Sequence, residues 1–299
     1  MLWTLAAFIA VLLLFAISKR KLGETAIRER LRGRVVVVTG ASSGLGRALA
    51  RACYNAGCVI IAAARNETAL AELSKELDGN VHVFPLDVSD FEGVELRAKA
   101  LLNSHGHVDV LINNAGVSSR SSVLETSLDV DQNIMNVNYF GAVALTRALL
   151  PSMIQKGKGH VVAISSVQGK LALPFRSSYS AAKHAMQAFF TSLRAEVSHL
   201  GIDVTVVSPG YIKTSLSANA LRGDGSKHKT TDPTTENGMS PERVASEILE
   251  AIASKKPELT VSDVTAKMGI YIQTLAPAIM RKLMARRAQK HERDHSKTS

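Results

Sequence analysis

Cysteine is scarce in this chain of 299 residues, which contains only Cys53 and Cys58. Two cysteines in the first third form no framework of spaced pairs, so a disulfide-stapled scaffold is excluded and a reducing compartment is favoured. The nine histidines are scattered without the spacing of metal ligands. We therefore expect no metal site.

Most of the chain lacks a surplus of either charge, although the net charge of the whole sequence is +10. Residues 19–34 and 281–299 each carry seven Lys or Arg against two acidic residues, a surplus of +5 in each segment. The residues between these two segments are balanced. Basicity confined to two edges argues against a DNA-binding face, and we expect no nucleic-acid partner.

The N-terminus carries an apolar run. Residues 2–18 have no charge and precede Lys19-Arg20-Lys21. A run of this length, seventeen residues, is at the short end of the range for a spanning helix. A cleaved signal peptide is the alternative, but no basic region precedes the run and no small-residue cleavage site follows it. We expect residues 1–21 to form an uncleaved single-pass signal anchor or a monotopic hairpin in the endoplasmic reticulum membrane, with the peroxisome or lipid droplet as other locations.

The positive-inside rule places the domain that follows the anchor in the cytosol. The sequon Asn66-Glu67-Thr68 is the mark of the lumenal alternative, in which Asn66 would be glycosylated. A glycan there would stand beside a predicted cofactor residue, so the cytosolic orientation is favoured.

Between residues 34 and 263, after a linker over 22–33, short apolar runs alternate with helical segments. This pattern is typical of βαβ units and a buried parallel sheet. Right-handed crossovers then predict one α/β domain with a doubly wound Rossmann-type sheet. Strands are expected at 35–38, 58–63, 81–86, 108–112, 160–165, 204–208 and 258–262. Helices are expected at about 45–55, 67–77, 90–104, 128–155, 178–198 and 241–254.

Two segments do not follow this pattern. Residues 213–240 are rich in glycine and polar side chains, which indicates a functional lid or a disordered loop. Residues 264–299 are apolar and basic together. They fit a membrane-surface helix or a final packing helix equally well.

A glycine-rich turn joins the first strand to the first helix. Gly40 permits a tight turn, Gly44 lets backbone approach a pyrophosphate, and Gly46 lets helix and strand pack closely. The spacing Gly-x-x-x-Gly-x-Gly differs from the standard dinucleotide fingerprint.

Polar residues follow the next three strands, at the sheet edge where open α/β sheets bind ligands. Arg65 stands where an adenosine ribose would lie and favours a 2′-phosphate, so NADP(H) is preferred over NAD(H); the alternative is a surface Arg at a strand end. Asp87 could meet the adenine amino group or cap a helix. Asn113-Asn114-Ala115-Gly116 could border the site or form a plain turn.

Tyr179 and Lys183 are four residues apart in a predicted helix and therefore share one face. A neighbouring ammonium stabilises a phenolate and moves the tyrosine pKa toward neutrality, where it can act as acid or base. The Ser166 hydroxyl could hold a carbonyl or hydroxyl oxygen in the same place. An exposed pair by coincidence is the alternative.

Together these motifs resemble the short-chain dehydrogenase/reductase family over about residues 33–262. The match rests on Thr39 to Gly46, Asn113 to Gly116, Asn138, Ser166, Tyr179, Lys183 and Pro209-Gly210. The resemblance implies hydride transfer from a nicotinamide, with Tyr179 as acid or base and Lys183 on the nicotinamide ribose. It further implies that Ser166 orients the substrate and that Asn138 holds a relay water. The implied cofactor contacts are Gly40, Ser42, Ser43, Gly44, Leu45, Gly46, Arg65, Asp87, Asn114, Ala115, Tyr179, Lys183, Pro209, Gly210, Ile212 and Thr214.

The substrate is predicted from the residues expected around Tyr179, which are Ser166, Gln168, Phe175 and Tyr211 together with the lid. Mostly apolar neighbours and a membrane tether favour a lipophilic carbonyl or alcohol, such as a steroid, a retinoid or an acyl- or alkyl-dihydroxyacetone phosphate. A membrane-tethered dinucleotide-binding regulator or scaffold is the competing interpretation. The complete catalytic set favours an enzyme, because a scaffold needs only the glycine turn and Arg65. Family resemblance also suggests a homo-oligomer through the helices at 128–155 and 178–198.

Overall fold

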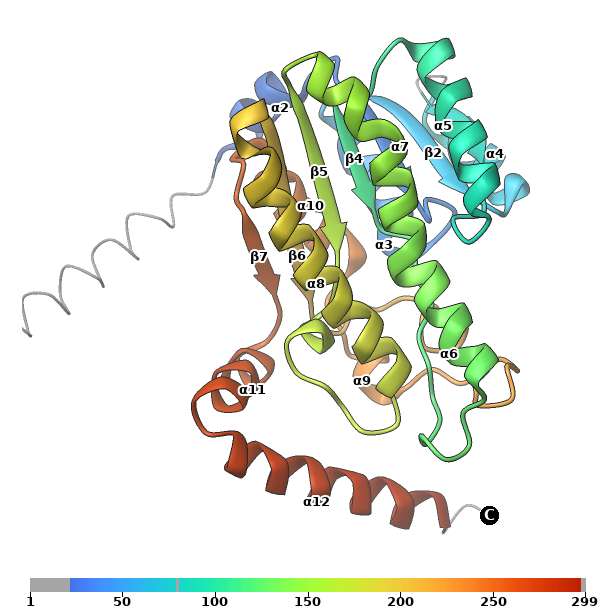
Figure 1. Cartoon of the computed structure of the whole chain (residues 1–299), viewed down its shortest axis with the longest axis vertical. Helices are drawn as coiled ribbons and strands as arrows, with labels where there is room; N and C mark the ends of the chain where they lie inside the picture. The colour runs from blue at the N-terminus through green and yellow to red at the C-terminus, as the bar shows by residue number, and fades with distance from the viewer. Residues whose placement is uncertain (1–21, 79–80, 297–299) are drawn as a thin grey trace, which may run out of the picture.

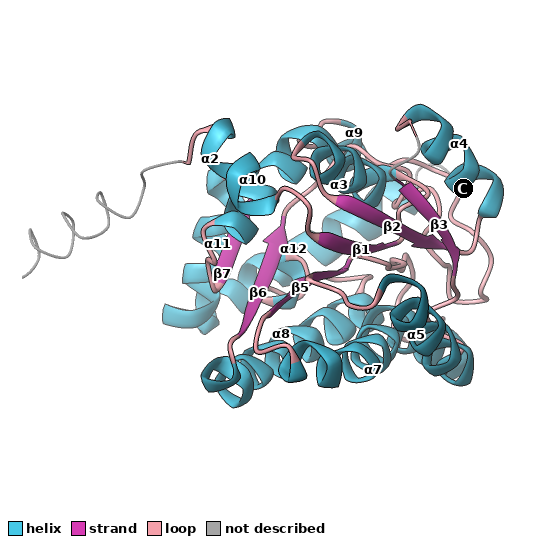
Figure 2. Ribbon diagram, turned by 90° about the horizontal axis from the view of Figure 1, so that it is seen from above, coloured by secondary structure: helices cyan, strands magenta, loops and turns pink. Residues whose placement is uncertain are grey.

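The computed structural model describes residues 22–78 and 81–296. A seven-stranded parallel sheet with strand order β3-β2-β1-β4-β5-β6-β7 forms its centre, with helices on both faces (Figures 1 and 2). This confirms the predicted doubly wound α/β sheet. The strands are β1 (Val35–Thr39), β2 (Val59–Ala64), β3 (Val81–Pro85), β4 (Val110–Asn113), β5 (Gly159–Ile164), β6 (Ile202–Pro209) and β7 (Glu258–Val261).

Two apolar layers hold the sheet between its helices. Strands β1, β4 and β5 are buried along their whole length, as expected of parallel strands covered on both faces. One layer packs the sheet against α3 (Gly44–Asn55), α4 (Glu67–Glu76) and α10 (Pro241–Ala253). The other packs it against α5 (Phe91–His105), α7 (Gly141–Gln155) and α8 (Ser177–Val197).

The strand order reverses at β1, which lies between β2 and β4. At this switch point the loops after the two halves of the sheet diverge, and a crevice opens beyond the carboxyl ends of the strands. The topology therefore places the ends of β1, β2, β4, β5 and β6 around one opening.

Segment 22–33, where a linker is expected, instead contains helix α2 (Glu24–Leu31). Leu31 is buried in the same layer as α3 and α10, and the Arg30 guanidinium donates a hydrogen bond to the Ala253 carbonyl at 3.0 Å. The segment is thus packed against the domain. The expected membrane anchor at 1–21 lies outside the described residues.

The helix expected over 128–155 has three parts: α6 (Leu128–Met135), the π-helical turn η1 (Asn136–Phe140) and α7. Within the described part of the chain, this stretch is the one candidate that is long and apolar enough to cross a membrane. Its apolar face belongs to the core, because Leu145, Leu149 and Met153 are buried against the sheet. Its apolarity is therefore that of a packed helix.

The remaining segments surround the crevice. Residues 213–240 are structured and include α9 (Pro233–Glu236) and single bridges such as Ser119 to Leu221. Short helices η2 (Val167–Gly169) and η3 (Ser198–Leu200) flank α8. Helices α11 (Val264–Leu275) and α12 (Pro277–Ser296) follow β7, and α12 runs below the carboxyl ends of the strands (Figure 1).

Candidate active site

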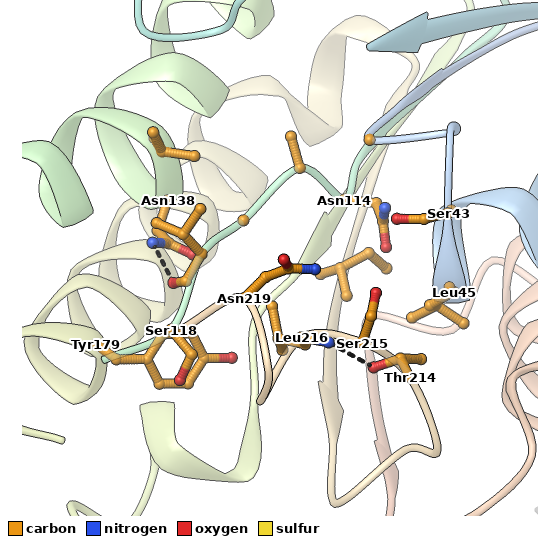
Figure 3. Close-up of a pocket in the computed structure, with 18 of the residues that line it drawn as sticks. Ser43, Leu45, Asn114, Ser118, Asn138, Tyr179, Thr214, Ser215, Leu216 and Asn219 are labelled. Atoms are coloured by element: carbon orange, nitrogen blue, oxygen red, sulfur yellow. Dashed lines mark hydrogen bonds between the residues drawn. The ribbon is translucent and has the colours of Figure 1, made fainter. Parts of the chain in front are cut away.

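A cleft of about 800 Å³ occupies the predicted crevice. It is lined by every predicted site residue except one: Gly40, Ser42, Ser43, Gly44, Leu45, Gly46, Arg65, Asp87, Asn114, Ala115, Asn138, Ser166, Gln168, Tyr179, Lys183, Pro209, Gly210, Tyr211, Ile212 and Thr214. Figure 3 shows Tyr179 and Asn138 on one side and Ser43 and Leu45 of the glycine turn on the other. Leu216 and Asn219 of the 213–240 segment lie between them.

Phe175, which was predicted to contact the substrate, is not among the residues that line the cleft. Its backbone has φ +61°, an uncommon value for a non-glycine residue, and its carbonyl accepts a hydrogen bond from the Ser121 amide at 3.2 Å. The turn at Phe175 instead presents its neighbour Arg176 to the cleft. We therefore replace Phe175 by Arg176 in the predicted substrate contacts.

The glycine turn fits a dinucleotide pyrophosphate. Gly40 and Gly44 have φ of +67° and +51°, a region that favours glycine. A Cβ on Gly46 would lie 2.2 Å from the Gly40 carbonyl oxygen, so only glycine allows helix α3 to start this close to β1. No side chain caps α3, whose N-cap is Ser43. The first amides of the helix thus face the cleft as anion donors.

Thr39 fastens this turn to the end of β4. Its hydroxyl oxygen accepts hydrogen bonds from the amides of Asn114 and Ala115 at 2.9 and 3.0 Å, and the Asn114 side chain donates to the Thr39 carbonyl at 2.9 Å. The Asn-Asn-Ala-Gly segment is therefore more than a surface turn, because it fixes the position of the glycine turn across the crevice.

Arg65 and Asp87 form the outer end of the cleft. The Arg65 Nη1 lies 3.7 Å from the Asp87 Oδ2, and the Arg65 side chain is 69% exposed. The Asp87 carboxylate also accepts bonds from the Ser89 amide at 2.9 Å and the Ser89 hydroxyl at 2.6 Å. Helix α5 is capped by Asp90 rather than Asp87. Burial raises the pKa of Asp87, but the Ser89 hydrogen bonds and the Arg65 charge together lower it by more, so the pKa lies below its usual value.

Tyr179 and Lys183 lie one turn apart on α8, as predicted, and both are buried. The Lys183 ammonium lies 5.7 Å from the centre of the Tyr179 ring and donates a hydrogen bond to the Ile164 carbonyl at 2.9 Å. Burial lowers the pKa of Lys183 to about 7. A coincidental exposed pair is excluded by this burial.

The pKa of Tyr179 is raised, whereas proximity to Lys183 predicts a lowered value. Burial of the phenol is the largest cause, and the Ser166 hydrogen bond and the charges of Arg120 and Arg176 lower the pKa only in part. Lys183 does not lower it, because an amine with a pKa of about 7 is already neutral at the high pH where the phenol would ionise. Tyr179 is therefore protonated at neutral pH, the form that donates a proton.

Ser166 begins the short helix η2 directly after β5. Its hydroxyl oxygen accepts a hydrogen bond from the Gln168 amide at 3.1 Å, which fixes the rotamer of the serine. The hydroxyl itself donates to the Pro209 carbonyl at 3.5 Å, and it lies close enough to Tyr179 to lower the pKa of the phenol. Two hydroxyl groups from separate elements, β5–η2 and α8, thus converge on one position in the cleft.

Asn138 sits in the π-helical turn and is fully buried. Its amide nitrogen donates to the carbonyls of Val117 and Ile134 at 2.8 and 2.9 Å, while its Oδ1 has no protein partner. A Cβ on Gly116 would lie 2.7 Å from this oxygen and 3.6 Å from the Lys183 Nζ, so Gly116 keeps the space between them open. A buried acceptor beside a lysine suits a bridging water.

The cleft is also lined by two arginines, Arg120 and Arg176, which sequence analysis did not identify as site residues. The guanidiniums of Arg120 and Arg176 both donate to the Asp232 Oδ2, at 2.6 and 2.8 Å, and both side chains are only 11% exposed. Arg176 also donates to the Tyr211 hydroxyl at 3.2 Å. Two cations share one carboxylate, so the cluster keeps a positive charge next to Tyr179. Arg120 is 112 positions from Asp232 in the sequence, and Arg176 is 56 positions from it. No local sequence pattern therefore indicates this cluster.

Comparisons with known proteins agree with this site. A family model described as short chain dehydrogenase matches residues 34–224. Dehydrogenase/reductase SDR family member 7B of Bos taurus is 50% identical over 276 residues, which cover 89% of this chain and 85% of that protein. The protein of the same name from Xenopus laevis is 49% identical over 87% of this chain and 83% of that protein.

Solved structures show the same architecture. A short-chain dehydrogenase from Streptomyces avermitilis has a TM-score of 0.73 at 32% identity and covers 87% of this chain and 97% of that chain. A short chain dehydrogenase/reductase from Burkholderia phymatum, in complex with NAD, has a TM-score of 0.73 at 24% identity over 84% of this chain and 96% of that one, a likeness of the fold. The resemblance deduced from the motifs is confirmed: the chain belongs to the short-chain dehydrogenase family of oxidoreductases, whose cofactor is a nicotinamide dinucleotide.

Proposed function

We propose that this protein interconverts a carbonyl and an alcohol on a lipophilic substrate, with NADP(H) as the cofactor. The observation that carries the proposal is the convergence of the Ser166 and Tyr179 hydroxyls in a cleft that also contains the glycine turn. The bound cofactor would supply or accept the hydride. It would be held by the glycine turn, by Asn114 and Ala115, and by Pro209, Gly210, Ile212 and Thr214.

Tyr179 would donate its proton to the substrate oxygen during reduction and remove it during oxidation. Ser166 would hold the same oxygen, because it lines the cleft with Tyr179 and its hydroxyl lowers the pKa of the phenol. Burial keeps the phenol protonated, which favours the reductive direction at neutral pH. Gln168 and Tyr211 also line the cleft and would contact the rest of the substrate.

Lys183 would bind the nicotinamide ribose hydroxyls and return a proton to Tyr179. Its pKa of about 7 lets the amine gain and lose a proton at neutral pH. The unpartnered Asn138 Oδ1 would hold a water that connects Lys183 to solvent. These roles agree with the opening that Gly116 leaves between the two side chains.

Arg65 would select NADP(H) by binding a 2′-phosphate. We expect Arg65→Ala to weaken NADPH binding about tenfold and leave NADH binding nearly unchanged. A charge-assisted hydrogen bond is worth about 1.5–3 kcal/mol, and screening at an exposed side chain reduces this to roughly 1.4 kcal/mol. Fluorescence titration of both cofactors at two salt concentrations measures the effect, which should shrink at high salt.

Arg243→Ala is the matched control for Arg65→Ala. Arg243 is equally exposed, at 67%, and pairs with Glu247 on α10, away from the cleft. Its replacement should change neither cofactor affinity. Tighter binding of NADH than NADPH by the unaltered protein, or unchanged NADPH affinity in Arg65→Ala, would refute the assignment.

The substrate would carry an anionic group in addition to its lipophilic part. The surplus positive charge of Arg120, Arg176 and Asp232 lies within reach of Tyr179, and Lys227 lines the same cleft. Among the predicted substrates, this favours an acyl- or alkyl-dihydroxyacetone phosphate over a steroid or a retinoid. A bidentate Arg–phosphate contact suits the planar guanidinium.

We expect Arg176→Leu to lower kcat/KM for the phosphate-bearing ketone about 10- to 100-fold, the size of one lost charge-assisted contact. The kcat/KM for a neutral ketone should stay within a few-fold, and Arg176→Lys should keep part of the phosphate preference. NADPH oxidation followed by absorbance measures both substrates. Turnover of the phosphate ketone no higher than in Tyr179→Phe would remove this substrate, and equal losses on both ketones would contradict the role of Arg176.

We further propose that residues 1–21 tether the protein to a membrane and that the domain faces the cytosol. The membrane would be that of the endoplasmic reticulum, the peroxisome or the lipid droplet. Protease added to intact microsomes should cleave the domain, whereas a protected, Asn66-glycosylated protein would place it in the lumen. A homo-oligomer through the helices of 128–155 and 178–198 also remains a prediction.

A further inference from the structure

Helix α11 has no buried residue in any of its twelve positions, although its sequence is mostly apolar and its one charge is Lys267. Its large apolar side chains are exposed: Val264 by 72%, Met268 by 57%, Tyr271 by 64% and Leu275 by 80%. Positions spaced by four, three and four residues fall on one face of a helix. The helix thus presents a continuous apolar face that no described part of the chain covers.

The apolar face continues onto α12 through Ile279 and Leu283, which are 56% and 41% exposed. The two helices are held in place, because Met280 of α12 is buried and approaches Gly269 of α11. Leu171, in the loop after η2, also contacts the α11 backbone at Gly269. A contiguous exposed apolar surface on a fixed element marks an interaction site.

Basic side chains border this face. On α12, Arg281, Lys282, Arg286, Arg287 and Lys290 are exposed. An apolar stripe flanked by Lys and Arg is the pattern of a helix that lies in the headgroup region of an anionic bilayer. A second copy of the chain is a poorer occupant, since pairing identical faces would bring these positive charges together.

The start of the described chain also indicates a membrane on this side. Helix α2 packs against α10, which also contacts β7. Figures 1 and 2 show α2 and α11 along the β7 edge of the sheet, with α2 at the top of Figure 1 and α11 toward the bottom. The uncharged run 2–18 precedes α2 in the sequence. An apolar segment joined to this side of the domain favours a lipid surface as the partner of α11.

We propose that α11 and the first half of α12 dock on the surface of an anionic bilayer, with Val264, Met268, Tyr271, Leu275, Ile279 and Leu283 inserted at the headgroup boundary. This contact is separate from any spanning by residues 1–21 and does not depend on the chemistry at Tyr179. The same helices touch the cleft, because the Arg287 Nη2 lies 3.4 Å from the Tyr211 hydroxyl. For the lipophilic substrate of the proposed function, docking therefore places the substrate end of the cleft beside the lipid.

The test uses the full chain reconstituted in vesicles of phosphatidylcholine and phosphatidylserine, with a nitrobenzoxadiazole label at Tyr271→Cys. Leu96→Cys is the matched control, because Leu96 is an apolar residue of α5 with 68% exposure, on the opposite side of the molecule from α11 (Figure 2). Cys53 and Cys58 are buried, and the unsubstituted chain gives the background labelling. Lipids with brominated acyl chains quench a label that enters the bilayer.

We expect several-fold stronger quenching at position 271 than at position 96. Arg281→Glu with Lys282→Glu should reduce the quenching at 271, as should removal of phosphatidylserine, while turnover of a water-soluble ketone stays unchanged. Equal quenching at both positions would overturn the proposal. The proposal would also be overturned if, in detergent without lipid, the label at position 271 became less accessible to water as the protein concentration rose. That result would identify a second copy of the chain as the occupant of the apolar face.

Discussion

Replacing Tyr179 by Phe is expected to lower kcat about 10³-fold, with little change in NADPH affinity. The substitution removes one oxygen and leaves the buried ring beside the Lys183 ammonium. General acid catalysis by a positioned side chain contributes about 10²- to 10⁴-fold. Because most of the implied cofactor contacts lie along the glycine turn and the strand ends, and the phenyl ring of the variant keeps the place of the phenol, the loss should appear in the chemical step and not in binding.

The measurement is single-turnover NADPH oxidation with any carbonyl compound that the unaltered protein reduces, together with a cofactor titration. Tyr54→Phe is the matched control, because Tyr54 lies on α3 and packs against the core away from the cleft. That variant should keep full activity. Retention of a tenth or more of the rate in Tyr179→Phe would show that another group supplies the proton.

The fold was predictable because its parallel strands are buried on both faces and therefore appear as short apolar runs in the sequence. The glycine turn was predictable for a similar reason: positive φ at Gly40 and close packing at Gly46 are requirements that only glycine meets. Helix α2 was not predicted, since its sequence is mainly polar and a single residue, Leu31, is buried. Its stability comes from packing on the domain, which has no local signal.

The parts of the site that the sequence missed depend on long-range contacts or local backbone strain. Arg120, Arg176 and Asp232 meet only because β4, α8 and the 213–240 segment surround one opening. Phe175 was expected in the cleft for its apolar character, but its backbone has φ +61° and its neighbour Arg176 lines the cleft instead. The spacing of Tyr179 and Lys183 reveals two neighbouring groups but not their burial, which raises the pKa of the phenol and lowers that of the amine.

Lys183→Met is expected to abolish turnover and yet raise the free energy of unfolding by about 3–4 kcal/mol at pH 6.5. Burial lowers the pKa of Lys183 from its ordinary value of 10.5 to about 7. Since a tenfold change in proton affinity is worth about 1.4 kcal/mol, holding the charged lysine in the core costs of the order of 5 kcal/mol. The variant avoids this cost but also loses the hydrogen bond to the Ile164 carbonyl, which lowers its stability by roughly 1–2 kcal/mol.

The gain should depend on pH with a definite sign. Below pH 7 both the folded and the unfolded chain hold the lysine proton, so the cost of burying the charge is complete. As the pH rises from about 7 towards 10.5, the folded protein releases the proton while the unfolded chain retains it, and linkage makes the unaltered protein more stable. The advantage of Lys183→Met over the unaltered protein should therefore be largest at pH 6.5 and small at pH 9.5.

Urea unfolding at the two pH values measures this difference between the two proteins. Lys158→Met is the control, because Lys158 is exposed and its replacement should leave stability unchanged at both values. A Lys183→Met protein that is less stable than the unaltered chain at pH 6.5 would mean that the ammonium stabilises the fold through its contacts. Equal gains at both pH values would instead show that shape, and not charge, decides the effect. The predicted outcome is that the domain gives up stability to keep an amine of near-neutral pKa beside Tyr179, where only the reaction uses it.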